Sequence, residues 1–123
     1  CIAMLLLQKR HEDANGNITA QRVGTVVVKY GKSTGGWVED ATYEIHYGNI
    51  TGKSFYNAAT MGLRSHDYAR NSKGKSVLVK ETGWASADAT PTHIVLQFSS
   101  SHGGAYVGTV GNTFWVDNVG LVY

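Results

Sequence analysis

The strongest pattern in the sequence is a two-residue alternation of apolar and polar side chains, which is typical of a β-strand with one buried face. It is clearest over residues 41–47, where three larger side chains alternate with three polar ones: Tyr43, Ile45 and Tyr47 against Thr42, Glu44 and His46. The sequence therefore predicts a strand over Ala41–Tyr47, with the two sets of side chains on opposite faces.

Two long apolar arms, Ile2–Gln8 and Gln21–Tyr30, predict a β-hairpin. The polar stretch between them contains Asn15-Gly16, and this dipeptide supplies the positive φ angles of a tight reversal. Residues 54–62 are expected to form one short helical turn. Further strands are expected over three stretches: Ser76–Lys80, His93–Ser99 and Asn112–Tyr123. Many short strands with almost no helix predict one all-β domain over residues 1–123, an antiparallel β-sandwich.

Composition and charge exclude several classes of protein. The net charge of +2 is small and the basic residues form no dense run, so a nucleic-acid partner is not expected. Cys1 is the sole cysteine, so no internal disulfide can form. The apolar run that follows Cys1 is too short for a transmembrane segment and reads as a core strand, so we expect the chain to be part of something longer. Asn17 and Asn49 begin possible glycosylation sequons.

The order of motifs over residues 91–123 resembles a known family. A buried strand ends in Ser99-Ser100-Ser101, a glycine loop follows at Gly103-Gly104, and the chain closes on a hydrophobic strand that contains Val116-Asp117-Asn118-Val119. This order resembles the carbohydrate metabolism domain of Bacteroidetes surface proteins, and Trp37 with Thr42–Tyr47 is similar to that family's tryptophan-plus-strand segment. The resemblance implies a carbohydrate-binding jelly roll on a secreted or cell-surface protein, with this chain as its later portion.

Asp117 is the candidate metal ligand. In a strand, Trp115, Asp117 and Val119 share one face, so Asp117 would be buried and would need a hydrogen bond or a cation. The resemblance implies a structural Ca²⁺, for which Asp117 would supply one oxygen ligand. The alternative is a β-bulge at Asp117-Asn118, capped by side-chain hydrogen bonds to the backbone.

Aromatic residues in loops are the candidate ligand-binding residues, because sugars stack their C–H faces on flat rings and bond polar groups at the ring edges. Trp84 lies in a polar, glycine-containing loop, and its alternative role is to anchor that loop. Tyr68 and Tyr106 are expected in or beside loops, with Arg70 as a polar partner, although each taken singly is also consistent with a solvated loop. Trp37 and Trp115 are expected in the core.

Three functions remain open. The first is non-catalytic carbohydrate recognition or surface attachment, with a glycan as the partner. The second is a structural subunit of an extracellular filament or adhesin, which self-associates or binds a partner chain through unpaired edge strands. The third, a glycan-active enzyme, needs two facing carboxylates, and the sequence identifies no such pair among its 9 acidic residues. We therefore expect no catalytic residue.

Overall fold

The computed structural model describes residues 1–39, 41–100, 111, 113–117 and 119–121. Almost all of its regular structure is extended: β1 (Ile2–Glu12), β2 (Ile18–Lys29), β3 (His46–Tyr47), α1 (Ala58–Met61), β4 (Asp67–Arg70), β5 (Ser76–Trp84) and β6 (His93–Ser99). The expected all-β class is confirmed, and so are the predicted bounds of β6 and a helical turn within residues 54–62.

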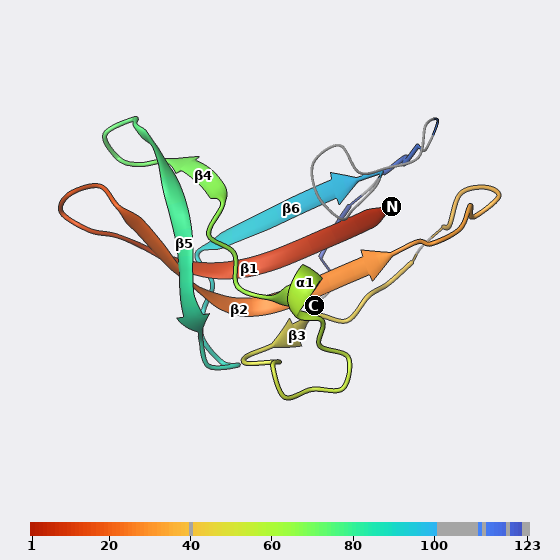
Figure 1. Cartoon of the computed structure of the whole chain (residues 1–123), viewed down its shortest axis with the longest axis horizontal. Helices are drawn as coiled ribbons and strands as arrows, with labels where there is room; N and C mark the ends of the chain where they lie inside the picture. The colour runs from red at the N-terminus through yellow and green to blue at the C-terminus, as the bar shows by residue number, and fades with distance from the viewer. Residues whose placement is uncertain (40, 101–110, 112, 118, 122–123) are drawn as a thin grey trace.

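The described strands form one curled sheet in the order β4-β5-β2-β1-β6, with β3 beside β2 (Figure 1). Four of the pairings are antiparallel, and the fifth, between β2 and β5, is parallel. The sheet is therefore mixed, where a wholly antiparallel order was expected. The described strands all belong to this one sheet, so the facing second sheet of a sandwich stays a prediction.

The first hairpin follows the prediction closely. Gly16 has a φ of 82°, and the Asp13 side chain accepts hydrogen bonds from the backbone N–H groups of Asn15 and Asn17, both at 2.9 Å. These bonds satisfy donors that the reversal removes from the ladder. The β1–β2 pairing then runs for eleven residues, with one irregularity after Leu7.

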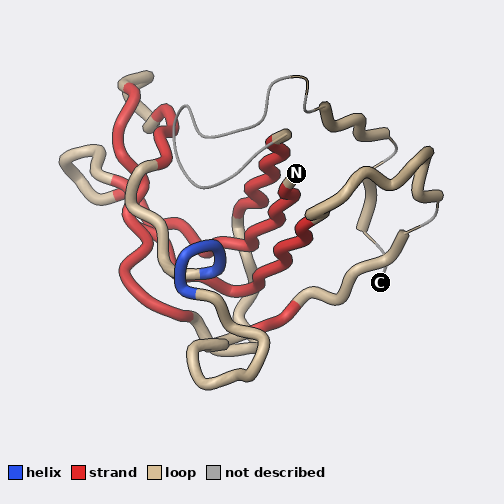
Figure 2. The backbone as a smooth tube through the Cα atoms, turned by 45° about the vertical axis from the view of Figure 1, so that its right-hand side comes forward, coloured by secondary structure: helices blue, strands red, loops and turns tan. Residues whose placement is uncertain are grey.

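Alternation along β1 gives the sheet two faces. The inner face is the one that carries Ile2, Met4 and Leu6. These three side chains are buried, and Val27 and Val95 pack against them. The outer face carries Leu5 and Leu7, and its buried cluster contains Leu7, Val23 and Ala85. A third cluster of buried residues, Ile18, Ala20 and Val79, joins β2 to β5. Figure 2 shows how the strands curve, with α1 in front of them.

Two sequence predictions about buried segments are wrong. The strand expected over Ala41–Tyr47 is reduced to His46–Tyr47, because the chain separates from β2 before His46. Trp37 and Trp115 are exposed, by 64% and 75%, instead of lying in the core. Trp37 follows the end of β2 in a wholly exposed connector, and the described residues of the closing segment contain no strand to hold Trp115 against a sheet face.

Candidate functional site

Trp84 ends β5 and is partly buried on the inner face. Its ring lies over the guanidinium of Arg22, with 5.4 Å from the guanidinium carbon to the ring centroid. The ring of Tyr56 forms a T-shaped contact with it at a centroid distance of 6.3 Å. Trp84 thus lies in a strand and not in the loop expected from the sequence, and its ring covers a buried charge.

Tyr68 and Arg70 lie on β4 and point to the outer face. Their neighbour Asp67 points inward to Arg64, and alternation places Tyr68 and Arg70 on the opposite side. Tyr68 is 70% exposed, and the guanidinium of Arg70 donates to the carbonyl of Gly74 at 2.9 Å. The structure therefore brings Tyr68 and Arg70 together but places Trp84 on the other face of the sheet. Tyr106 lies outside the described residues.

Asp117 is exposed and lies in a segment without regular structure. The argument that a strand would bury it among apolar groups therefore does not apply. Among the residues that the structure describes, no three histidine, cysteine or acidic side chains cluster as metal ligands would. Calcium binding at Asp117 stays a prediction, without the support that burial would have given it.

The sequence did not anticipate the buried ion pair between Arg22 and Glu81, whose side chains are 0% exposed. The guanidinium Nε donates to Glu81 Oε2 at 2.7 Å and Nη2 donates to Glu81 Oε1. Nη1 donates to Thr25 Oγ1 and to the carbonyl of Met61, both at 3.1 Å, and Nη2 also donates to the carbonyl of Gly62 at 3.0 Å. All five N–H donors of Arg22 are therefore engaged.

The Glu81 carboxylate is engaged to the same degree. Besides Arg22, Oε2 accepts from the side-chain amide of Gln8 at 2.9 Å, and Oε1 accepts from the backbone N–H of Arg64 at 2.7 Å. A carboxylate has about four acceptor positions, and four donors use them here. This network has no open position for a ligand, and it ties β5 to β2 and α1 to the inner face.

Arg64 extends the network toward solvent. Its Nε and Nη2 donate to the two carboxylate oxygens of Asp67, at 2.8 and 2.7 Å, and Nη2 also donates to Gln97 at 2.8 Å. The hydrogen bonds from Arg64 lower the pKa of Asp67, against the desolvation that raises it. Asp67 is therefore held as a carboxylate and is not a candidate proton donor at neutral pH.

An open pocket of about 210 Å³ lies at the edge of β2. The ladder between β2 and β3 consists of Gly24↔Tyr47 and Thr25↔His46, and its continuation would pair Val26 to Val28 with residues 45 to 43. The chain instead turns away at Ile45, which packs on the cluster of Leu7 and Val23. The pocket occupies the resulting gap in the ladder.

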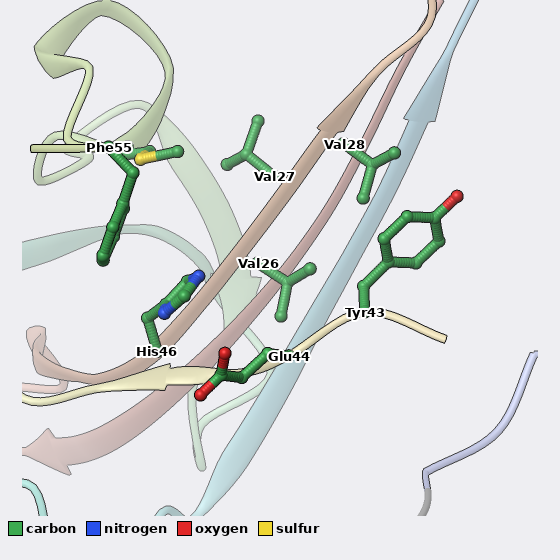
Figure 3. A pocket seen from close by; sticks show the side chains of 8 residues that line it. Val26, Val27, Val28, Tyr43, Glu44, His46 and Phe55 are labelled. Atoms are coloured by element: carbon green, nitrogen blue, oxygen red, sulfur yellow. The ribbon is translucent and has the colours of Figure 1, made fainter. Parts of the chain in front are cut away.

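Figure 3 shows the pocket between the valines of β2 on one side and Tyr43, Glu44 and His46 on the other. The His46 ring stacks on Phe55, with 4.0 Å between centroids and 26° between planes, and Met61 completes the lining. The hydroxyl groups of Tyr43 and Tyr30 are hydrogen-bonded to each other, and this contact closes the gap next to the C-terminal end of β2. The same bond raises the pKa of Tyr43, so its phenol stays neutral.

The pocket combines three kinds of binding group. Val26, Val27 and Val28 give it an apolar wall, and the exposed rings of Tyr43 and Phe55 flank it. The Glu44 carboxylate supplies a charged acceptor. Antiparallel pairing with β1 engages every second residue of β2, so the alternate backbone N–H and C=O groups face the gap.

Sequence reasoning missed this pocket and named none of its lining residues as ligand-binding residues. The alternation over residues 41–47 predicted a continuous strand, and a continuous strand would have filled the gap with backbone hydrogen bonds. No signal in the sequence shows that the ladder stops at His46. The buried pair did leave a signal: Arg22 is a charged residue within an apolar arm, and such a residue needs a partner when it is buried.

Within the described part of the chain, no helix is both long enough and apolar enough to cross a membrane. Comparison of the chain with protein families, with curated proteins and with solved structures gave no match.

Proposed function

We propose that the chain is a non-catalytic carbohydrate-recognition or attachment module of an exported protein, and that the pocket at the edge of β2 receives one sugar unit. The observation that carries the proposal is the combination, in one open gap, of aromatic rings, a carboxylate and outward-facing backbone groups. Sugars need these groups together, because their rings are apolar on the C–H faces and polar at the hydroxyl edges.

The size of the pocket supports a small ligand. Its volume of about 210 Å³ is below the range of roughly 300–1,000 Å³ that is usual for drug-sized ligands. Phe55, braced by its stacking on His46, is the proposed platform for the sugar ring. Glu44 is the proposed acceptor for hydroxyl groups. A single sugar at the end of a chain, or a protruding branch, suits this gap better than a long polymer.

Recognition fits the pocket better than hydrolysis does. Cleavage of a glycosidic bond generally requires two carboxyl groups on either side of the bond, and Glu44 is the one acid among the residues described as lining the pocket. The buried Glu81 cannot serve as the second acid, because Arg22, Gln8 and Arg64 use all of its acceptor positions.

The residues expected from the sequence keep a secondary place in the proposal. Tyr68 and Arg70 are proposed as an outer contact for a longer glycan, since both are exposed on β4. The finer fold, a jelly-roll-like sandwich, also stays a proposal: the half-buried outer-face residue Leu5 is where a second sheet would pack.

Affinity electrophoresis against a panel of soluble glycans, with a glycan array to choose the panel, tests the proposal. We expect wild type to be retarded by at least one glycan, Phe55→Ala to lose the retardation, and Glu44→Gln to weaken it. Trp37→Ala is the matched control, because it removes an exposed ring that is not among the residues lining the pocket and should bind as wild type does. Absence of binding by wild type would refute the function, and unchanged binding by Phe55→Ala would refute this location of the site.

A further inference from the structure

Glu44 differs from most acids of the described chain, because no donor within the described residues reaches its carboxylate. Five of the others accept a hydrogen bond from a nearby side chain or backbone N–H: Glu12, Asp13, Asp67, Glu81 and Asp88. The ion pairs among the described residues join Arg22 to Glu81 and Arg64 to Asp67, so neither involves Glu44. The carboxylate that lines the pocket therefore keeps its acceptor positions open.

The pocket offers no basic side chain to balance this charge. Glu44 belongs to the segment that leads into β3 and is exposed (Figure 3). The other described lining residues are three valines, Tyr43, His46, Phe55 and Met61, and none of them is a lysine or an arginine. A carboxylate in this position attracts a cationic ligand and repels an anionic one.

The backbone of β2 adds an acceptor to the same gap. Cys1 and Tyr30 exchange two hydrogen bonds, at 3.0 and 3.2 Å, so the backbone groups of Tyr30 face β1. Antiparallel pairing alternates along the strand, so those of Val27 face away from β1 and into the gap. The carbonyl of Val23, four residues earlier, faces the same way and accepts from the N–H of Gly48 at 2.9 Å.

The aromatic rings favour a cation as well. Tyr43 and Phe55 are 46% and 40% exposed, and the face of an aromatic ring carries a partial negative charge. An ammonium group has three N–H donors and no acceptor, so it needs surroundings of this kind. The carboxylate, the carbonyl of Val27 and the ring faces together match an ammonium group better than they match a neutral hydroxyl.

We propose that the pocket recognises an amino sugar with a free amine, whose ammonium group donates to Glu44 and to the carbonyl of Val27 while its ring lies against Phe55. This inference rests on the proposed carbohydrate function and deepens it. A neutral sugar offers a weaker hydroxyl donor at the same position, and N-acetylation removes the positive charge. An acidic sugar is repelled by Glu44.

The preference is expected to be moderate, because Glu44 is exposed and water screens its charge. From the strength of exposed ion pairs and of hydrogen bonds to charged groups, we expect an amino sugar to bind roughly three- to tenfold more tightly than its hydroxyl counterpart. Salt at about 0.5 M should reduce this ratio, since it screens exposed charges.

Nuclear magnetic resonance titration of the full chain with methyl glycosides tests the inference. The ligands are the glycosides of glucosamine, galactosamine and mannosamine, each beside counterparts that carry a hydroxyl or an acetamido group instead of the amine. Titration at about pH 6.5 keeps the amine protonated, since amino groups of this kind have a pKa of about 7.7–8.0. For wild type, at least one amine should bind more tightly than both of its counterparts and should shift the amide signals of residues 26–28.

Variants of Glu44 identify the group responsible. Glu44→Gln should bring the affinities for the amine and the hydroxyl sugar to about the same value, and Glu44→Lys should make the amine the weaker ligand. Glu39→Gln is the matched control, because it neutralises another exposed acid that does not line the pocket, and it should keep the preference of wild type. Far-UV circular dichroism establishes that each variant is folded, and the two variants of Glu44 back each other up if one is not.

The outcomes separate this inference from the proposed function. Wild type that binds other glycans of the panel but no amino sugar, equal binding of amine and hydroxyl sugars, or a preference that survives in Glu44→Gln would each overturn the inference and leave the function standing. Equally tight binding of Nα-acetyl-lysine amide would also overturn it, because the pocket would then recognise an amine without its sugar. If no glycan binds at all, the proposed function fails as well.

Discussion

Substitution of Glu81 by glutamine probes the most heavily bonded part of the molecule. Each carboxylate oxygen accepts from two donors: Oε1 from Arg22 and the backbone N–H of Arg64, and Oε2 from Arg22 and Gln8. An amide NH₂ at either position would face two donors, and the buried Arg22 would lose its counter-charge. Removal of one partner from a buried pair typically costs about 3–5 kcal/mol. A loss of this size is a large fraction of the 5–15 kcal/mol that stabilises a typical domain.

Urea unfolding followed by circular dichroism measures the effect. With a slope of about 2 kcal/mol per molar urea, a loss of about 4 kcal/mol lowers the unfolding midpoint by about 2 M. The control is Asp67→Asn, which breaks the more exposed pair with Arg64 and should cost about 1 kcal/mol or less.

A double-mutant cycle completes the test. Arg22→Met combined with Glu81→Leu removes both charges, so the double variant should be more stable than the sum of the two single losses predicts. If Glu81→Gln lowers the midpoint no more than Asp67→Asn does, or if the cycle is additive, the buried pair does not hold the inner face together.

Three further predictions follow from single contacts. Arg64 lowers the pKa of Asp67, so the stabilisation that this ion pair gives the fold is present above the usual aspartate pKa near 3.8 and is lost as the pH falls through the lower pKa of the folded protein. The unfolding free energy should therefore decline more between pH 6 and pH 2 for wild type than for Asp67→Asn. Equal declines would contradict the assignment. In Gly24→Ala the new Cβ would lie 2.8 Å from Ile45 Cγ2, so we expect a loss of about 1–3 kcal/mol in urea unfolding, whereas Gly52→Ala, with nothing within 4 Å, should be nearly neutral. The Asn71 side chain donates to the carbonyl of Gly16 and accepts from two backbone N–H groups of its own turn. Asn71→Ala should therefore lower the free energy of unfolding by about 1–3 kcal/mol and speed amide exchange in both hairpin turns. Unchanged exchange would show that the contact does not tie the two turns together.

Local pattern predicted those parts of the fold that depend on local chemistry. The Asn15-Gly16 turn and the two apolar arms identified the β1–β2 hairpin, because turn residues and alternation act over a few positions. The bounds of β6 were predicted for the same reason. Local pattern failed for the pairing of β2 with β5, since neighbours about sixty positions apart in the sequence leave no periodic trace.

The candidate site was harder to predict than the fold. Its position depends on where the β2–β3 ladder stops, and the alternation over residues 41–47 continues past that point without a change. Tryptophan also misled the expectation, because its usual burial depends on a sheet face to pack on and Trp37 has none. Arg22 was visible as a charged residue in an apolar arm, but its partner Glu81 could be identified only from the tertiary structure.

The position of the Arg22–Glu81 pair has a consequence for how the parallel strands find their alignment. A slip of one residue would move Glu81 to the opposite face of the sheet and leave the Arg22 charge enclosed without a counter-ion. Misaligned pairing therefore carries an electrostatic penalty of several kcal/mol that apolar contacts alone would not impose. Arg22 thereby favours one alignment of β2 with β5, which is the only parallel pairing among the described strands.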